Sequence, residues 1–393
     1  MIDVKIKYDC CGCSACAQIC PKQCIEMKKD NEGFDYPYVH KQNCIDCNLC
    51  IKVCPQINNT PSNKVLHAYA LKHPVLEIQK NSSSGGAFSI LAEYVISNGG
   101  IVFGARFNDK WDVIHDKVET LQGIKKLRMS KYVQSSINST FIKCQKYLKT
   151  GRLVLYVGTP CQIHALKLFL SKDYDNLIAI DFVCHGVPSP VIWKKYLDSL
   201  TSQSLTKRNK HNKQIFYNNI EKIQFRNKKN GWLQFSFYLQ GRLKGLNSKH
   251  IELNENFKKN PYLRGFIHDL FLRPSCYKCK NKSFKSGSDI TLCDFWGIQE
   301  TYPHLFDKNG ISGVTINSKK GETIINNLNV KLNEVQYYDM LKYNPSFETS
   351  VTEPPFRKLF FKLIIFMPFR LSVYSVQALN KFYLIVSKTF RNE

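Results

Sequence analysis

The sequence predicts a mixed α/β fold, in which a small cysteine-rich α+β module precedes an α/β domain with added antiparallel strands. Three observations support this prediction. One spacing of cysteines occurs twice within residues 10–55. From residue 65 onward, apolar strands alternate with helical patterns, which is typical of a parallel sheet covered by helices. After residue 222, shorter alternating segments indicate antiparallel strands.

The N-terminal cysteines form two runs of the same spacing, Cys-x2-Cys-x2-Cys-x3-Cys-Pro, which start at Cys10 and Cys44. In the bacterial ferredoxin run, three thiolates of one run and the fourth of the other hold each 4Fe-4S cluster. A pair of zinc knuckles is the alternative, but four-ligand zinc sites would leave several of these cysteines without a role. We therefore expect two 4Fe-4S clusters, held by Cys10, Cys13, Cys16 and Cys54 and by Cys20, Cys44, Cys47 and Cys50.

The chain length of 393 residues is sufficient for two or three domains. We expect the two-cluster module over residues 1–58, a polar linker at 58–63, the α/β domain over 64–345 and a tail over 346–393. The first residues lack an apolar signal core, which favours a reducing cytoplasm in which thiolates stay free to bind iron. The formal charge of +25 is spread over the whole length and omits cluster thiolates and bound phosphates, so we expect no nucleic-acid partner.

A serine- and glycine-rich segment precedes the first helical pattern of the α/β domain. It contains Ser83, Ser84, Gly85 and Gly86, after which apolar residues recur at helical spacing from Phe88. A helix start with free amides and small side chains suits a phosphate or a flavin pyrophosphate. An ordinary serine cap with glycines for close packing is the alternative. The segment 101–107 then reads as the next strand.

Two strand-to-helix junctions follow, and each carries a cysteine. The apolar strand 153–157 leads into Gly158, Thr159 and Cys161, and the strand 177–183 leads into Cys184 and His185. Ligands of parallel sheets gather outside the carboxyl ends of the strands, so Cys161 and Cys184 are expected on one rim.

A Cys-x2-Cys pair, Cys276 and Cys279, brings the number of candidate ligands near this rim to four. Four thiols suffice for a third 4Fe-4S cluster or for a zinc ion, and the two clusters upstream favour iron. Cys293 is a spare candidate ligand. The remaining cysteines, Cys11, Cys24 and Cys144, are interpreted as small buried residues or neighbours of the ligands.

Other polar segments have weaker signals. Lys131 and Tyr132 lie in an expected loop between helical segments, where they face either a cofactor or solvent. The basic segment 203–222 is interpreted as a solvated loop, since it lacks the interleaved aromatic residues of a single-strand nucleic-acid binder. The segments 223–225 and 232–239 are expected to form a hairpin, and 261–272 a helix.

The tail from about residue 359 to 390 is apolar and basic. Charged residues interrupt it well before the ~20 apolar residues that a spanning helix needs. A helix docked onto the body is the commoner outcome for such a segment, and a membrane-surface or partner-binding helix is the alternative.

With these residues in view, the chain resembles the coenzyme F420 hydrogenase/dehydrogenase beta-subunit family of iron-sulfur flavoproteins. The similar stretches keep the same order over residues 65 to about 300. They are 83–89 (SSGGAFS), 100–105 (GIVFGA), 130–135 (SKYVQS), 158–162 (GTPCQ), 184–190 (CHGVPSP), 225–232 (FRNKKNGW), 276–279 and 289–297 (DITLCDFWG). Cys293 stands where the family more often has glycine.

The resemblance implies an oxidoreductase in which FAD exchanges a hydride with a soluble carrier or a small-molecule substrate and iron-sulfur clusters exchange electrons with a redox partner. Some members are associated with bacterial polysaccharide synthesis. On this interpretation Ser83 to Gly86 hold phosphate, Lys131 and Tyr132 lie near the flavin with Gly158 and Thr159 at the same edge, and His185 and Lys131 are candidate catalytic residues. An electron-transfer subunit without its own substrate and a zinc-containing binding protein are the alternatives. Chemistry of this kind pairs one-electron clusters with a two-electron flavin.

Overall fold

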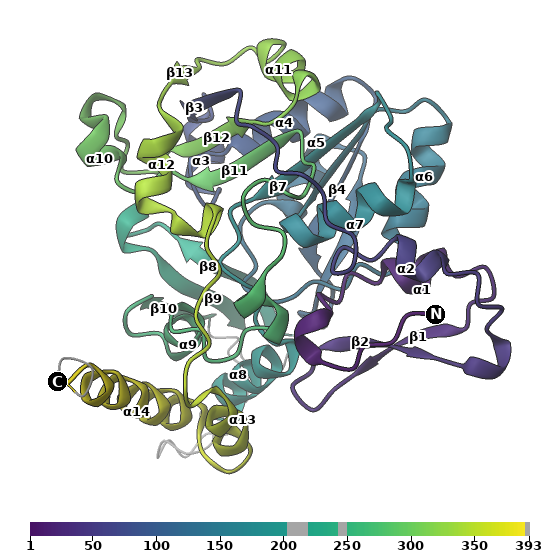
Figure 1. Cartoon of the computed structure of the whole chain (residues 1–393). Helices are drawn as coiled ribbons and strands as arrows, with labels where there is room; N and C mark the ends of the chain where they lie inside the picture. The colour runs from purple at the N-terminus through teal and green to yellow at the C-terminus, as the bar shows by residue number, and fades with distance from the viewer. Residues whose placement is uncertain (203–218, 243–249, 390–393) are drawn as a thin grey trace.

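The computed structural model describes residues 1–202, 219–242 and 250–389. They form an α/β body with the N-terminal module at one side and two helices at the C-terminal end (Figure 1). Most of the basic segment expected to be a solvated loop, including Lys207, Arg208, Lys210 and Lys213, lies outside the described residues.

The N-terminal module is an α+β unit, as predicted, and its backbone repeats with its sequence. Ser14 and Asn48 occupy the same place in the two cysteine runs, and both have left-handed backbone angles (φ 60° and 59°) directly before a short helix. Asn tolerates this conformation better than most residues, and tight turns between cluster ligands require it. The elements are η1 (Lys7–Asp9), α1 (Ala15–Ile19), β1 (Ile25–Lys29), β2 (Asp35–Val39), η2 (Lys41–Asn43) and α2 (Leu49–Lys52), with β1 and β2 antiparallel.

The body is built on an eight-stranded mixed sheet of order β13-β3-β12-β11-β7-β6-β4-β5. Its centre is parallel, as the alternating strands and helices predicted, and its edges are antiparallel. The parallel strands are β4 (Ile101–Phe107), β6 (Val154–Gly158), β7 (Leu177–Phe182) and β11 (Ile290–Asp294). The antiparallel strands are β3 (His67–Leu71), β5 (Val113–Val118), β12 (Ser312–Ile316) and β13 (Asn333–Glu334), with β13 and β5 at the two edges.

Helices cover both faces of this sheet because its strands are apolar on both sides. Phe103 and Tyr156 pack with α6 and α7 on one face, whereas Val102 and Leu155 pack with α4 and α5 on the other. The helices are α3 (Leu76–Lys80), α4 (Ala87–Ser97), α5 (Leu121–Leu127), α6 (Thr140–Lys149), α7 (Pro160–Leu170) and α11 (Lys319–Asn326).

A second, three-stranded antiparallel sheet of order β10-β9-β8 packs through aromatic side chains around Trp193 and Phe225. The predicted hairpin is present, but its second strand starts at Ser236 because Trp232–Gln234 forms a 3-10 turn. The predicted helix from Pro261 ends at Ile267, shortly before Asp269, which has a left-handed φ of 61°. The elements are α8 (Pro190–Ser202), β8 (Ile220–Asn227), η5 (Trp232–Gln234), β9 (Ser236–Arg242), β10 (His250–Asn256), α9 (Pro261–Ile267) and η6 (Pro274–Lys278).

The C-terminal part adds short helices and ends in two longer ones, α13 and α14, which separate at Pro368. None of the helices in the described ranges is long and apolar enough to cross a membrane. The elements are α10 (Ile298–Thr301), η7 (Pro303–Leu305), α12 (Tyr337–Tyr343), η8 (Pro345–Phe347), α13 (Arg357–Phe366) and α14 (Phe369–Thr389).

Buried polar contacts fasten the N-terminal module to the body. Glu32 in the β1–β2 turn accepts two hydrogen bonds from the Arg357 guanidinium, at 2.9 and 2.5 Å. Gln18 at the end of α1 accepts from the backbone amide of Phe141 at the start of α6, at 3.1 Å. Bidentate pairs of this kind fix orientation as well as distance. The cysteine-rich module is therefore held in one position against the α/β domain.

Candidate active site

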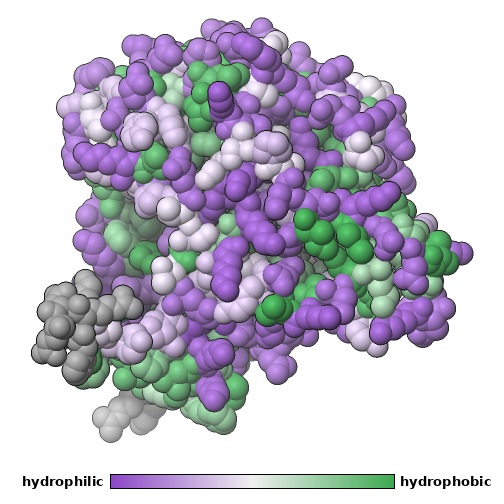
Figure 2. Space-filling view, viewed as in Figure 1, coloured by the Kyte–Doolittle hydropathy of each residue, from purple (hydrophilic) through white to green (hydrophobic). Residues whose placement is uncertain are grey.

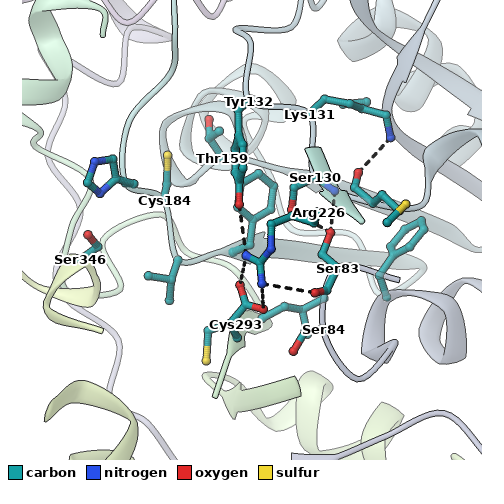
Figure 3. Close-up of a pocket in the computed structure, with 18 of the residues that line it drawn as sticks. Ser83, Ser84, Ser130, Lys131, Tyr132, Thr159, Cys184, Arg226, Cys293 and Ser346 are labelled. Carbon is teal, nitrogen blue, oxygen red and sulfur yellow. Dashed lines mark hydrogen bonds and ion pairs between the residues drawn. The ribbon is translucent and has the colours of Figure 1, made fainter. Parts of the chain in front are cut away.

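A cavity of about 680 Å³ lies outside the carboxyl ends of β6, β7 and β11. Its other walls come from β8 and α9 of the small sheet region, so it sits between the two sheets (Figure 3). Cavities of this size hold cofactor-sized ligands, and this edge is where parallel sheets bind them. The residues predicted to bind cofactor that line it are Ser83, Ser84, Gly86, Lys131, Tyr132, Gly158 and Thr159.

The serine- and glycine-rich segment leads into α4 at the cavity wall. Gly85, outside the cavity lining, has no room for a side chain, because a Cβ there would lie 2.4 Å from the carbonyl oxygen of Leu71 and 2.5 Å from the amide nitrogen of Ser312. Gly86 has a φ of 101° and caps α4. The segment therefore needs its glycines, and its tight path brings the first amides of α4 to the cavity.

The two serine hydroxyls of this segment are already engaged by protein atoms. Ser84 Oγ donates to the carbonyl oxygen of Ile311 at 2.5 Å, and Ser83 Oγ accepts from the Ser130 amide at 2.7 Å. These bonds tie the α4 start to β12 and to the loop that carries Lys131. At the α4 N-terminus, the Ala87 amide donates to Ser312 Oγ at 3.4 Å and the Ser89 amide donates to the carbonyl oxygen of Gly86 at 2.9 Å. What this helix start offers an anionic ligand is the Phe88 amide and the positive end of the helix dipole.

A second helix, α7, begins at the same cavity. Thr159 and Gln162 form a capping box, with the Thr159 amide 2.9 Å from Gln162 Oε1, and Pro160 occupies the first turn as predicted. Gln162 also donates to Ser135 Oγ at 3.0 Å. Gly158 and Thr159 are thus held firmly at the cavity edge, and the cavity receives the positive ends of two helices.

Lys131 and Tyr132 both line the cavity, but the Lys131 ammonium is already bonded to protein atoms. The Lys131 ammonium donates to three backbone carbonyl oxygens of its own loop, of Leu127, Arg128 and Met129, at 2.9–3.0 Å. In Figure 3 it lies away from Arg226 at the centre. Burial lowers the pKa of Lys131 to about 7. Tyr132 stacks on Phe266, with ring centroids 4.4 Å apart.

An ion pair that the sequence patterns did not predict crosses the cavity floor. Arg226 from β8 donates twice to Asp294 at the end of β11, both at 3.0 Å, and donates to Tyr132 Oη at 3.2 Å. Its Nε is buried and has no hydrogen-bond partner within the described residues. Asp294 also accepts from Trp232 Nε1 at 3.0 Å. The sequence did contain a signal for this ion pair, because Arg226 lies within the FRNKKNGW stretch and Asp294 within the DITLCDFWG stretch.

His185 lies at the cavity wall next to Cys184. Its Nε2 is 2.6 Å from Asp269 Oδ1, and its ring meets Phe266 edge to face. Asp269 follows α9 with a left-handed backbone, so the end of that helix aims the carboxylate. A histidine oriented by a carboxylate is an arrangement that holds and moves protons.

A second buried histidine, His115 from β5, also lines the cavity and was not predicted. Its Nε2 is 3.0 Å from the carbonyl oxygen of Val157, and its Nδ1 is buried without a partner among the described residues. Burial lowers the pKa of His115 to about 4. The neutral ring therefore presents an acceptor that is unsatisfied in the protein alone.

The four cysteines proposed for a third cluster gather behind the cavity. Cys161 starts α7, Cys184 follows β7, and Cys276 and Cys279 come from η6. Like-charge repulsion from Cys184 and Cys279 adds to burial in raising the pKa of Cys276, and Cys279 also acts on Cys161 and Cys184. The Val187 amide points to Cys276 Sγ at 3.4 Å. The four thiols thus form one connected group, and Cys184 belongs to the cavity wall.

The eight N-terminal cysteines lie in two neighbouring sets. Cys20, Cys44, Cys47 and Cys50 line one small pocket together with Pro21 and Cys24. In the other set, burial and repulsion from Cys10 and Cys54 raise the pKa of Cys16, which also interacts with Cys50 of the first set. Within the described ranges, no three or more His, Cys, Asp or Glu side chains close around one metal ion. A cubane cluster spreads its thiolates more widely than one ion does.

The other four cysteines lie in four different environments. Side-chain hydrogen bonds from Cys13 and Cys161 lower the pKa of Cys11, so this thiol lies between the second N-terminal set and the group behind the cavity. Cys24 Sγ is 3.4 Å from Cys20 Sγ, and Cys144 is buried in the core. Cys293 lies near the end of β11, and its Sγ is 4.0 Å from Met340 Sδ. Burial, with added repulsion from Asp294, raises the pKa of Cys293.

Two family models match parts of this chain. Residues 151–339 match the family model for the C terminus of the coenzyme F420 hydrogenase/dehydrogenase beta subunit, and residues 9–57 match the 4Fe-4S dicluster domain. A chain of the F420-reducing NiFe hydrogenase complex from Methanosarcina barkeri is 16% identical, with a TM-score of 0.43 over 81% of this chain and 91% of that chain. None of the curated proteins matches this chain.

Proposed function

Because the chain belongs to the coenzyme F420 hydrogenase/dehydrogenase beta-subunit family and carries a 4Fe-4S dicluster domain, we propose that it is a flavin-dependent oxidoreductase supplied with electrons by iron-sulfur clusters. The observation that carries the proposal is the series of cysteine sets between the surface and the cavity. The series starts at exposed Cys47, continues through Cys16 and Cys11, and ends at Cys184 in the cavity wall.

In this proposal each cysteine set binds one iron-sulfur cluster. The two N-terminal sets each hold a 4Fe-4S cluster, and Cys161, Cys184, Cys276 and Cys279 hold a third. The clusters supply one-electron transfer, and their potentials respond to nearby charge, hydrogen bonds and burial. Buried Arg273, the Val187 amide and Lys282 are among the groups of this chain that act on the third set.

The cavity is proposed to hold FAD, which supplies two-electron hydride exchange when bound. The starts of α4 and α7, where the helix dipoles favour negative charge, would face its phosphates. Arg226, with its unpartnered Nε, and the His115 Nδ1 acceptor are polar groups that protein atoms leave unsatisfied among the described residues. Buried polar groups normally have partners, so these two atoms fit a polar ligand in the cavity.

The His185–Asp269 pair is proposed to hold the proton that accompanies hydride exchange. It lies at the edge of the cavity nearest the third cysteine group, and His185 is partly exposed, so it can exchange protons with water. Lys131 is proposed as a positioning residue for the loop over the cavity, because its ammonium donates to that loop's carbonyl groups. The acceptor is proposed to be a soluble carrier or a small substrate, including one from polysaccharide synthesis.

Anaerobic purification with iron and flavin analysis tests the proposal. We expect about twelve iron atoms, from three four-iron clusters, and one FAD per chain. Absence of flavin, or about eight iron atoms, would contradict its central part. Reduction followed by a screen of deazaflavin, nicotinamide and sugar-nucleotide acceptors then identifies the substrate class. Turnover of none of them, with all cofactors present, would indicate an electron-transfer subunit instead.

Replacing Cys47 with Ala separates electron entry from flavin binding. Cys47 is exposed and far along the series from the cavity. We expect the variant to keep its flavin and to accept electrons from a protein donor more slowly. Loss of flavin in this variant would show that the two regions do not function separately.

A further inference from the structure

The last helix, α14, is packed against the body over only part of its length. One side of its first half is buried, with Ser372, Val373 and Val376 inaccessible and Gln377 bonded to Arg264 of α9. After Val376, no described side chain of α14 through residue 387 is buried. Figure 1 shows this half extending from the body. The tail therefore packs on the body, as expected, through one side of α13 and the start of α14, and the rest of α14 does not.

The uncovered half and the neighbouring end of α13 expose large apolar side chains. Phe366 is 85% exposed and Phe382 is 68% exposed. On α14, Leu379, Phe382 and Tyr383 follow the spacing of one helix face, whereas Lys381 lies on the opposite face. Figure 2 shows hydrophobic surface at this end of the molecule. The exposed apolar set is Ile365, Phe366, Leu371, Leu379, Phe382, Tyr383 and Leu384.

This apolar surface lies in a segment without acidic residues. Residues 354–392 contain seven Lys and Arg and no Asp or Glu. Arg357 pairs with Glu32 of the N-terminal module and Arg370 pairs with Glu255 of β10. Lys358, Lys362 and Lys381 are exposed. A helix with an apolar aromatic face and a basic opposite face is the type that lies in the headgroup region of an anionic membrane.

We propose that the exposed surface of α13 and α14 binds an anionic lipid surface and attaches this protein to it peripherally. A second copy of the chain would bring a like-charged segment of the same composition against this one. A protein groove that accepts α14 alone would leave Ile365 and Phe366 exposed. A flat anionic surface contacts the apolar side chains of both helices together with Lys358 and Lys362, which follow the spacing of the same α13 face as Ile365. This is why it is the partner that fits.

Vesicle flotation of the full, anaerobically purified protein tests this proposal. We expect binding to phosphatidylcholine vesicles rich in phosphatidylglycerol, little binding to phosphatidylcholine alone, and weaker binding at high salt. Phe366→Ser with Phe382→Ser should weaken binding at least about tenfold, because the apolar anchors are lost. Each substitution of Lys358 or Lys362 by Gln should weaken it roughly fivefold, and Lys381→Gln should weaken it less because Lys381 lies on the opposite face of α14. The matched control, Leu121→Ser with Tyr338→Ser, removes equally exposed apolar groups elsewhere and should bind as well as the unmodified protein.

The proposal is overturned if the full protein ignores anionic vesicles, or if the double phenylalanine variant binds them unchanged. Light scattering of the same samples shows whether the protein is a dimer. A dimer that the two phenylalanine substitutions dissociate would assign this surface to a second copy of the chain. Iron and flavin contents are measured in parallel. Because the substituted residues lie far from the cavity, failure of membrane binding is distinguishable from failure of the proposed redox function.

Discussion

The Arg273 side chain donates a hydrogen bond from Nε to the carbonyl oxygen of Cys10 at 2.7 Å, across 263 residues of sequence. Its other nitrogens donate to Gln134 Oε1 at 3.0 Å and to the carbonyl oxygen of Asp35 at 2.8 Å. The guanidinium is fully buried and lies over the Tyr36 ring. Arg273 directly precedes η6, which carries Cys276. One arginine therefore links the first cysteine run to the group behind the cavity.

Replacing Arg273 with Met should destabilise the protein by at least about 3 kcal/mol, because three buried acceptors lose a charged donor. Urea unfolding under anaerobic conditions measures this change. The matched control is Arg242→Met, since Arg242 is mostly exposed and forms a surface pair with Glu221. That control should cost less than about 1 kcal/mol. Equal losses in the two variants would show that Arg273 does not fasten the module.

The segment before α4 gives a second prediction. Gly85→Ala should lower the free energy of unfolding by about 1–3 kcal/mol, since the new methyl would overlap backbone atoms of β3 and β12, which cannot move independently. We also expect less bound flavin, because the α4 start must shift. Gly104→Ala is the control, as its Cβ would meet Leu127 at an ordinary 3.5 Å. Unchanged stability and flavin content in Gly85→Ala would contradict the role given to this close approach.

Lys131 gives a prediction about pH. Burial lowers its pKa to about 7, so between about pH 7 and 10 the unfolded chain holds a proton that the folded chain has released. The free energy of unfolding should therefore rise with pH across this window. Lys131→Met should reduce the rise by up to about 4 kcal/mol. Buried Lys228, whose pKa is also lowered to about 7, keeps its own contribution.

Urea unfolding at intervals across this pH window measures the slope. The exposed Lys126→Met variant is the control and should leave the slope unchanged. A slope in Lys131→Met equal to that of the unmodified protein would mean that the three carbonyl acceptors keep Lys131 protonated in the folded state.

Much of this fold followed from local patterns in the sequence. The spacing of the cysteine runs predicted a repeated module, and the left-handed Ser14 and Asn48 show the repeat in the backbone. Pro160 and the apolar strands predicted the junction at α7, because helix starts and buried strands depend on residues close in sequence. The same reasoning predicted that Cys161 and Cys184 share a rim, since parallel neighbours end at one edge.

The contacts that complete the site could not be predicted in this way. Arg226 and Asp294 are 68 residues apart and meet because β8 of the small sheet folds over the end of β11. Cys11 looked like a spare thiol, and only the docking of the module brings it to Cys161. Such pairs depend on the relative placement of two sheets and a module, and no local period or motif spacing encodes that placement.

The assignment of the third cluster gives the last prediction. Cys161→Ser should lose about four of about twelve iron atoms, because Cys161 belongs to the connected group with Cys279. Cys293→Ser should keep all its iron, since the groups near Cys293 are Met340 and Asp294, and the four cysteines of the group do not contribute to its pKa. Both thiols are partly buried and lie near the cavity, so each variant controls for the loss of a thiol there. Iron analysis with low-temperature electron paramagnetic resonance of the reduced proteins separates the outcomes. Loss of a cluster in Cys293→Ser, with iron retained in Cys161→Ser, would transfer the ligand role to Cys293 and move the cluster from behind the cavity to the end of β11.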